Sequence, residues 1–329
     1  MEFYCKMKKT FALVVLAAFL LIACRPTAVH HCAAPVFGTY YTVTYCGDED
    51  AGLQASLDSL FTAFSSEFSL FDSSSVVCRL NRGEDVVLSK DFERLLQLSM
   101  QISRNTDGAF DVTVAPLVKL WGFGPDSLRE VTPQMVDSVL ENVGYKKIGL
   151  EYSHLIKRNA NIQLDFGAIA KGLAVDKAVA LMRQRGHADF LVDIGGEVRT
   201  CGSKYGKPWR IGVQVPTADS DGEIASNYDF PLTDKAIATS GNYRNYHEKD
   251  GERFSHIINP TTGYSERSDL LSVSVIADDC TTADAYATAL MVMGREKSLQ
   301  WLQAHPELAA YLIYYEDGGF KVARTPNFP

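Results

Sequence analysis

Short strand-like segments follow one another through the second half of the chain, and their order limits the fold more than any other feature. Each segment alternates or is continuously apolar over a few residues, and Gly, Pro or Asn separates it from the next. The segments are ADFLVDIGG, EVRTCG, WRIGVQV, KAIATSG, ERFSHIINP and LLSVSVIA. Helical patterns interrupt them without the regular alternation that a doubly wound parallel sheet requires. We therefore predict an α+β fold with a mixed, mainly antiparallel sheet flanked by helices.

Amphipathic helices are predicted mainly in the first half. Leu53, Leu57 and Phe61 recur at helical spacing, and Ser89 is suited to cap a second helix. The predicted helices cover about 51–68, 90–103, 133–143 and 168–185, with one more at 282–293 and another through 301. The other predicted segments are a strand at 36–46, a loop at 71–85, strands within 146–164 and a C-terminal hairpin turned at 317–319.

The N-terminus has the pattern of a bacterial export signal. Lys6, Lys8 and Lys9 precede the apolar run FALVVLAAFLLIA, which is shorter than a membrane-spanning helix. The run ends at Cys24 in a lipobox-like pattern, so we predict a lipoprotein signal peptide at 1–23, lipidation of Cys24, a tether at 24–35 and one domain at 36–329. An uncleaved anchor or an ordinary signal is the alternative. The prediction places the protein outside the cytoplasm, anchored to a membrane by its lipid.

Charge and cysteine content exclude several classes. The chain has a net charge of −8, and no cluster of Lys or Arg follows the signal, so nucleic acid is not an expected partner. A ligand that carries phosphate must be held by a few local donors or by a metal. The cysteines after Cys24 show no C-x-x-C and no histidine at ligand spacing, so they are predicted to be buried thiols or one or two disulfides rather than a zinc site. They are at positions 32, 46, 78, 201 and 280.

Lys171 lies in the segment LDFGAIAKG, where a strand end turns through Asp165 and Gly167 into a helix. The N-terminus of a helix offers unpaired N–H groups, and an ammonium in its first turn adds a full charge. That combination suits a phosphate, although the P-loop and dinucleotide fingerprints are absent. The alternative is a lysine that is only solvated.

Asp284 and Thr288 are four residues apart in CTTADAYATALM and therefore share one face of a helix that is otherwise small or apolar. A carboxylate and a hydroxyl in such surroundings need partners. Hard oxygen ligands suit Mg²⁺ or Ca²⁺. The alternative is that the aspartate accepts from backbone donors near the helix start and the threonine bonds the carbonyl of the preceding turn.

Three further segments are candidates. His256 precedes an Asn-Pro turn in FSHIINPTTGY, where it could accept a proton near neutral pH. The paired glycines of DIGGEVRTCG indicate close approach of a ligand or of another strand. Asp111 and Thr113 in DGAFDVTVAPL belong either to the edge of a ligand site or to a turn.

Eight segments in order, over residues 36–324, resemble the ApbE family of FAD:protein FMN transferases. They are FGTYYTV, FSLFDSSSVVCRLNRG, TDGAFDVTVAPLVKLWGFG, LDFGAIAKGLAVDKA, FLVDIGGEV, AIATSGNYRNY, SHIINPTTG and CTTADAYATALMVMG. The resemblance implies Mg²⁺-dependent transfer of FMN from FAD to a Ser or Thr hydroxyl of an acceptor protein, with release of AMP. The alternatives are hydrolysis of FAD to FMN and AMP, or a flavin-binding lipoprotein without catalysis.

The same resemblance assigns roles to individual residues. It implies that Asp284, Thr288 and the backbone carbonyl of Ala168 bind Mg²⁺, and that His256 deprotonates the incoming hydroxyl, with Asp284 also counted as catalytic. Eight positions are implied to contact FAD: Phe37, Phe71, Ala109, Phe110, Asp111, Asp165, Lys171 and Ile258.

Overall fold

The computed structural model describes residues 28–123, 131–214, 224–242, 246–249, 252–255, 257–265 and 268–329. Its helices are α2 (Leu53–Phe68), α3 (Val76–Asn81), α4 (Lys90–Asn105), α5 (Ala115–Leu120), α6 (Pro133–Leu140), α7 (Ala170–Gln184), α8 (Cys280–Met293) and α9 (Arg295–Gln303), with a 3-10 turn at Tyr145–Lys147. Its strands are β1 (Val29–Val36), β2 (Thr39–Cys46), β3 (Ile148–Glu151), β4 (His154–Lys157), β5 (Phe190–Ile194), β6 (Glu197–Cys201), β7 (Trp209–Gln214), β8 (Ile224–Leu232), β9 (Ala236–Gly241), β10 (Tyr246–Lys249), β11 (Glu252–Ser255), β12 (Leu270–Ala277), β13 (Ala309–Glu316) and β14 (Gly319–Arg324).

An eight-stranded sheet organises the molecule, in the order β1-β2-β5-β6-β9-β12-β13-β14. Every ladder between these strands is antiparallel. Three two-stranded hairpins, β3-β4, β7-β8 and β10-β11, accompany it. The predicted α+β fold with a mainly antiparallel sheet is confirmed.

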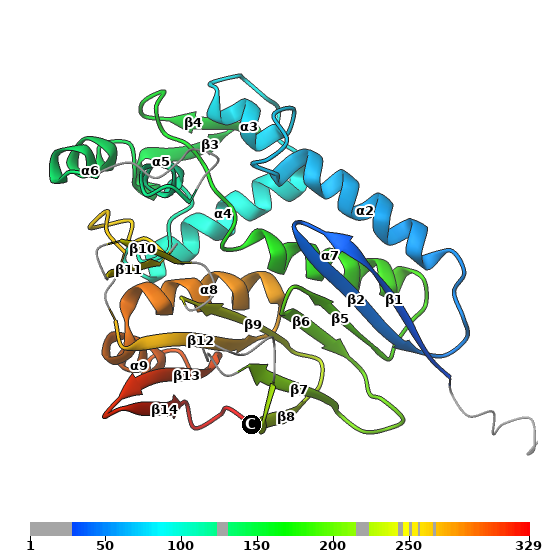
Figure 1. The fold of residues 1–329 in the computed structure, drawn as a ribbon. Coiled ribbons are helices and arrows are strands. Elements are labelled where there is room, and N and C mark those ends of the chain that lie inside the picture. Colours follow the sequence, from blue (N-terminus) through cyan, green and yellow to red (C-terminus); the bar gives the residue numbers. More distant parts are fainter. Residues whose placement is uncertain are drawn as a thin grey trace, which may run out of the picture.

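The two faces of the sheet are covered differently, as Figure 1 shows. Helices α7 and α8 lie along one face, with α2 and α4 beyond them, and the largest hydrophobic core fills the space between these helices and the strands. Hairpin β7-β8 lies against the other face, where Ile211 and Phe230 join a second core with Ile237 of β9. Since both faces of the sheet are covered, β12 is buried almost throughout, including its two serines, Ser272 and Ser274.

Helix ends follow the sequence signals closely. Ser89 accepts a hydrogen bond from the N–H of Phe92 at the start of α4, and Thr132 caps α6 in the same way just before Pro133. Asp279 caps α8, and Gly294 ends it with a φ of 74°. The terminal hairpin turns through Asp317 and Gly318, both with positive φ, as a tight two-residue turn requires.

Several segments differ from the sequence-based expectation. Part of the expected tether at 24–35 is strand β1, which pairs with β2 over its whole length. Its pattern is weak because it is an edge strand rich in Ala and His, and an edge position also tolerates Pro35. The expected loop at 71–85 contains α3, which is capped by Ser75, and the segment with Asp111 continues into the six-residue helix α5. Such short helices show too few turns for a periodic signal.

The predicted signal peptide and the lipidation site Cys24 lie outside the described residues. Among the residues that are described, no helix is long and apolar enough to cross a bilayer. The five cysteines at 32, 46, 78, 201 and 280 are all free thiols, and all but Cys78 are buried.

Candidate active site

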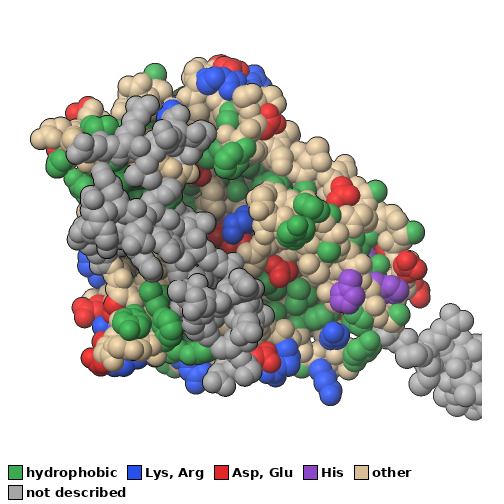
Figure 2. Space-filling model, viewed as in Figure 1, with side chains coloured by type: hydrophobic (Ala, Val, Ile, Leu, Met, Phe, Trp, Pro, Cys, Tyr) green, Lys and Arg blue, Asp and Glu red, His purple; other side chains and the backbone are tan. Residues whose placement is uncertain are grey.

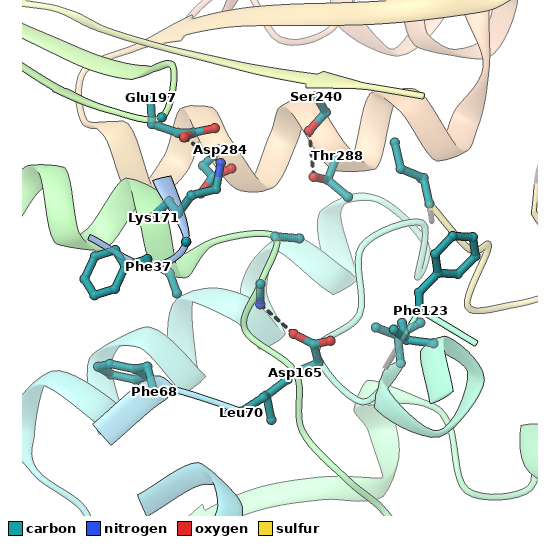
Figure 3. A pocket seen from close by; sticks show the side chains of 18 of the residues that line it. Phe37, Phe68, Leu70, Phe123, Asp165, Lys171, Glu197, Ser240, Asp284 and Thr288 are labelled. Carbon is teal, nitrogen blue, oxygen red and sulfur yellow. Dashed lines mark hydrogen bonds and ion pairs between the residues drawn. The ribbon is translucent and has the colours of Figure 1, made fainter. Parts of the chain in front are cut away.

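A cavity of about 2020 Å³ opens between the helices, the central strands and the loops around α3 and α5. In the surface view of Figure 2, basic and acidic side chains meet in a hollow near the middle of one face. Figure 3 shows residues from separate parts of the chain pointing into it. The cavity is lined by these sequence-predicted residues: Phe37, Phe71, Ala109, Phe110, Asp111, Asp165, Ala168, Lys171, Ile258, Asp284 and Thr288. His256 lies outside the described residues.

Helix α8 presents Asp284 and Thr288 to the cavity, one turn apart (Figure 3). The carboxylate of Asp284 is 4% exposed, and its Oδ2 accepts a hydrogen bond of 2.9 Å from the N–H of Gly172. The hydroxyl of Thr288 lies 2.8 Å from that of Ser240 on β9. Among the described residues, no hydrogen bond reaches Oδ1 of Asp284, which leaves that oxygen available to a ligand.

Gly172 explains how α7 comes close enough to donate to Asp284. A Cβ at this position would lie 2.3 Å from the carbonyl oxygen of Cys280 and 2.8 Å from Cα of Thr281, which no real side chain allows. Asp176, one turn further along α7, accepts hydrogen bonds from the N–H groups of Cys280 and Thr281. The N-terminal parts of α7 and α8 are thus fixed against each other by backbone contact.

The side chain of Lys171 is only partly exposed and is held in an ion pair. Its Nζ lies 2.6 Å from Oε2 of Glu197, whose side chain is only 3% exposed. Asp284 also lies close to the ammonium in Figure 3, and its charge helps to raise the pKa of Lys171. The lysine is therefore flanked by two buried carboxylates, one on β6 and one on α8.

Burial and the neighbouring charges shift the pKa values of Lys171, Glu197 and Asp284 in opposite directions. Burial raises the pKa of both Glu197 and Asp284 above the usual range of a carboxyl group, and the nearby ammonium of Lys171 only partly offsets this. Burial alone would lower the pKa of Lys171, but the two carboxylates raise it. Because both neighbours favour its charge, Lys171 stays protonated.

Two further aspartates line the cavity. Asp165 lies across the cavity from α8 in Figure 3, and its Oδ1 accepts a 2.7 Å hydrogen bond from the N–H of Gly167. Burial raises its pKa. Asp111 is 6% exposed and accepts from the backbone and hydroxyl of Thr113 and from the N–H of Tyr145. Its carboxylate therefore fixes the loop that carries Ala109 and Phe110.

Aromatic side chains also line the cavity. Phe37 occupies the two-residue turn between β1 and β2 with a φ of 49°, a conformation that costs a bulky residue strain. Its ring packs against Phe61 and Phe64 of α2, at centroid distances of 5.7 and 5.4 Å. Phe71 is 93% exposed at the rim. A flat apolar ligand could stack here without displacing core side chains.

The residues that line the cavity carry more acidic than basic groups, which suits a bound cation. The charged lining residues are Arg82, Asp111, Lys119, Asp165, Lys171, Asp193, Glu197 and Asp284, so five acids face three bases. Within the described ranges, no group of three His, Cys, Asp or Glu residues could bind a metal by itself. The oxygen donors of Asp284 and Thr288, which line the cavity together with Ala168, fit a hard cation that shares its coordination with a ligand.

An α+β protein with a large cavity, lined by convergent charged groups and aromatic rings, belongs to the class with a candidate ligand-binding or active site in that cavity. A sequence model of the ApbE family matches residues 37–312. The chain belongs to the ApbE family.

Relatives match over nearly the whole chain. The FAD:protein FMN transferase of Vibrio cholerae is 36% identical over 330 residues, which cover 96% of this chain and 97% of the relative. That of Haemophilus influenzae is 34% identical over 98% of both chains. Among solved structures, the flavin transferase ApbE of Vibrio cholerae has a TM-score of 0.83 at 33% identity, covering 92% of this chain and 99% of its own. The apo form of the Pseudomonas stutzeri flavinyl transferase has a TM-score of 0.82 at 32% identity, covering 91% and 95%.

Sequence reasoning missed some lining residues. They are Glu197, which the sequence shows only within a segment of paired glycines, and Ser240 and Phe123. A signal for Glu197 exists, because a glutamate in the buried pattern of β6 needs a partner. Ser240 and Phe123 offered none, since a serine near a strand end and an aromatic in a loop are common.

Proposed function

We propose that this protein transfers FMN from FAD to a Ser or Thr hydroxyl of an acceptor protein, with release of AMP and dependence on Mg²⁺. The observation that carries the proposal is the oxygen-donor face of α8, Asp284 and Thr288, inside an acidic cavity. The relatives named as FAD:protein FMN transferases support transfer of FMN from FAD to a protein. FAD carries a dianionic pyrophosphate, so an acidic cavity needs a cation to hold it.

The transfer is a substitution at phosphorus. The acceptor's hydroxyl oxygen forms a bond to the phosphorus of the FMN half, and the bond from that phosphorus to the bridging oxygen breaks. The electron pair leaves with AMP, and the hydroxyl proton passes to a base. His256 is our proposed base.

Asp284, Thr288 and the Ala168 carbonyl would hold Mg²⁺. When bound, Mg²⁺ would neutralise pyrophosphate charge and polarise the phosphorus. Lys171 would add a second positive charge beside the pyrophosphate or ribose, and Asp165 would accept from nucleotide donors. Phe37, Phe71 and the segment from Ala109 to Asp111, with Ile258, would contact the flavin and adenine ends.

We also propose that the protein is exported and tethered by a lipid on Cys24, with residues 1–23 removed as the signal peptide. The support is the charged start, the short apolar run and the cysteine that ends it. Metabolic labelling with a radiolabelled fatty acid tests this. The unmodified protein should incorporate label and a Cys24→Ala variant should not, whereas equal labelling would contradict lipidation at Cys24.

Transfer is tested by mixing the purified protein with FAD, Mg²⁺ and a candidate acceptor protein. Flavin fluorescence that stays with the acceptor in a denaturing gel, together with AMP, is the expected result. Release of AMP and free FMN without labelled acceptor would indicate hydrolysis. Binding of FAD without AMP would indicate a flavin-binding protein and would overturn the proposal.

His256→Ala is expected to slow transfer more than it weakens FAD binding. Removal of a general base costs on the order of 10²–10⁴-fold in rate and leaves the binding contacts in place. Single-turnover transfer rates and a fluorescence titration of FAD separate the two effects. Equal loss of rate and of affinity would make His256 a binding residue instead.

Phe71→Ala is expected to weaken FAD binding with little change in melting temperature. The ring is 93% exposed and contributes nothing to the core, whereas a lost stacking contact costs about 0.5–1.5 kcal/mol of binding energy. Phe71→Tyr retains the ring and serves as the control. If FAD binds the alanine variant as tightly as the unmodified protein, Phe71 does not contact the flavin.

A further inference from the structure

Strand β6 contacts α7 through one row of side chains. Every second residue of the strand points toward the helix. Glu197 contacts Lys171, Arg199 contacts Asp176, and Cys201 contacts Arg183. The first two contacts are ion pairs. A buried ion pair is seldom better for stability than apolar packing, so each pair calls for a separate explanation.

The pair between Arg199 and Asp176 is explained by the fold. Besides Arg199, Asp176 binds the N–H groups of Cys280 and Thr281 and the hydroxyl of Thr281, and so fixes the start of α8. It joins three elements without lining the cavity, since neither Arg199 nor Asp176 is among the lining residues.

The pair between Glu197 and Lys171 is different because it lines the cavity. Lys171 has three carboxylates near its ammonium, those of Asp193, Glu197 and Asp284, but its direct ion pair, at 2.6 Å, is with Glu197. Asp284 receives the N–H of Gly172 instead. Without the carboxyl group of Glu197, Asp193 and Asp284 would be the carboxylates left near the ammonium, and an ion pair with Asp284 would occupy the oxygen that a cation needs.

We infer that Glu197 is a positioning residue: it holds the ammonium of Lys171 away from Asp284 and so leaves Asp284 open to a divalent cation. This inference rests on the proposed Mg²⁺ site of the flavin transfer reaction. It assigns to Glu197 an effect that depends on Lys171 being present.

The test is a comparison of Glu197→Gln in two backgrounds. Mg²⁺ is titrated calorimetrically into the full chain saturated with FAD, without acceptor. In the unmodified background, Glu197→Gln should weaken Mg²⁺ binding by about 10–100-fold, as loss of a residue that orients a ligand does. In a Lys171→Met background the same substitution should weaken binding by less than about threefold, because interacting residues are not additive.

An equal loss in both backgrounds would overturn the inference, since it would mean that Glu197 acts only through its own charge. If Glu197→Gln does not fold, Glu197→Asp replaces it. Aspartate keeps the carboxylate on a shorter side chain, and its effect must again depend on Lys171.

Arg199→Met is the matched control: it breaks the neighbouring ion pair and should lower the melting temperature without changing Mg²⁺ affinity. Absence of Mg²⁺ binding by the unmodified protein would instead contradict the proposed metal site itself.

Discussion

Replacing Asp284 with asparagine is expected to reduce Mg²⁺-dependent flavin transfer by at least about a hundredfold, which is the loss typical of removing one electrostatic contact to a reacting group. Asparagine keeps the shape of the side chain and can still accept the N–H of Gly172, so the contact between α7 and α8 is retained. What it removes is the charge that would hold the cation. The measurement is the rate of acceptor labelling over a range of Mg²⁺ concentrations.

The same variant should unfold at an equal or higher temperature near neutral pH. Burial raises the pKa of Asp284 in the folded protein, so its contribution to stability is complete below the unfolded value of about 4 and is lost as pH rises through the folded value. Asparagine does not titrate, so the variant does not lose stability in this way. Its melting temperature should therefore fall less, or rise more, between about pH 4 and pH 7 than that of the unmodified protein.

Two outcomes would contradict this account of Asp284. Full activity of Asp284→Asn at low Mg²⁺ would remove the residue from the metal site. A marked loss of thermal stability at pH 7 would show that the carboxylate is held for the fold. An increase in stability together with a loss of activity is the pattern expected of a group kept for function.

Gly172→Ala is the second substitution with a large expected effect. The added methyl group would lie 2.3 Å from the carbonyl oxygen of Cys280, and backbone cannot move aside as a flexible side chain can. Helix α7 must shift away from α8, at a cost of about 1–3 kcal/mol in the free energy of unfolding. The shift would also withdraw the N–H of Gly172 from Asp284, so Mg²⁺ and FAD should bind more weakly.

Gly149→Ala is the matched control for that experiment. It makes the same change in strand β3, where an added Cβ meets no atom within 4 Å. Its effect on unfolding should stay within about 0.5 kcal/mol. Thermal unfolding of both variants, with Mg²⁺ titrations, is the measurement, and similar behaviour of the two would show that close contact at Gly172 is not required.

Local signals in the sequence predict many boundaries of helices and strands, and they place Asp284 and Thr288 on one helix face. The caps at Ser89 and Thr132 and the turn at Asp317-Gly318 set element boundaries through contacts with near neighbours in the chain. The i, i+4 spacing of Asp284 and Thr288 places them on one helix face whatever surrounds the helix. Such features depend on a few consecutive residues, so sequence alone can predict them.

The contacts between distant segments could not be predicted in this way. Lys171 was consistent with a solvated lysine until the fold placed Glu197 of β6 beside it. For Asp111 the sequence could not show that its carboxylate accepts hydrogen bonds from Thr113 and from the distant Tyr145. Strand β1 gives no clear alternation because it is an edge strand with one partner. In each case the partner is defined only by the tertiary structure.

We propose above all that Asp284, Thr288 and the Ala168 carbonyl hold a divalent cation against the pyrophosphate of FAD. A crystal structure of the protein with FAD and Mn²⁺, as an anomalously scattering substitute for Mg²⁺, tests it most directly. We predict an anomalous peak in contact with those three oxygens and with the pyrophosphate. FAD bound in the cavity with the peak elsewhere, or with Asp284 paired to Lys171 instead, would contradict it.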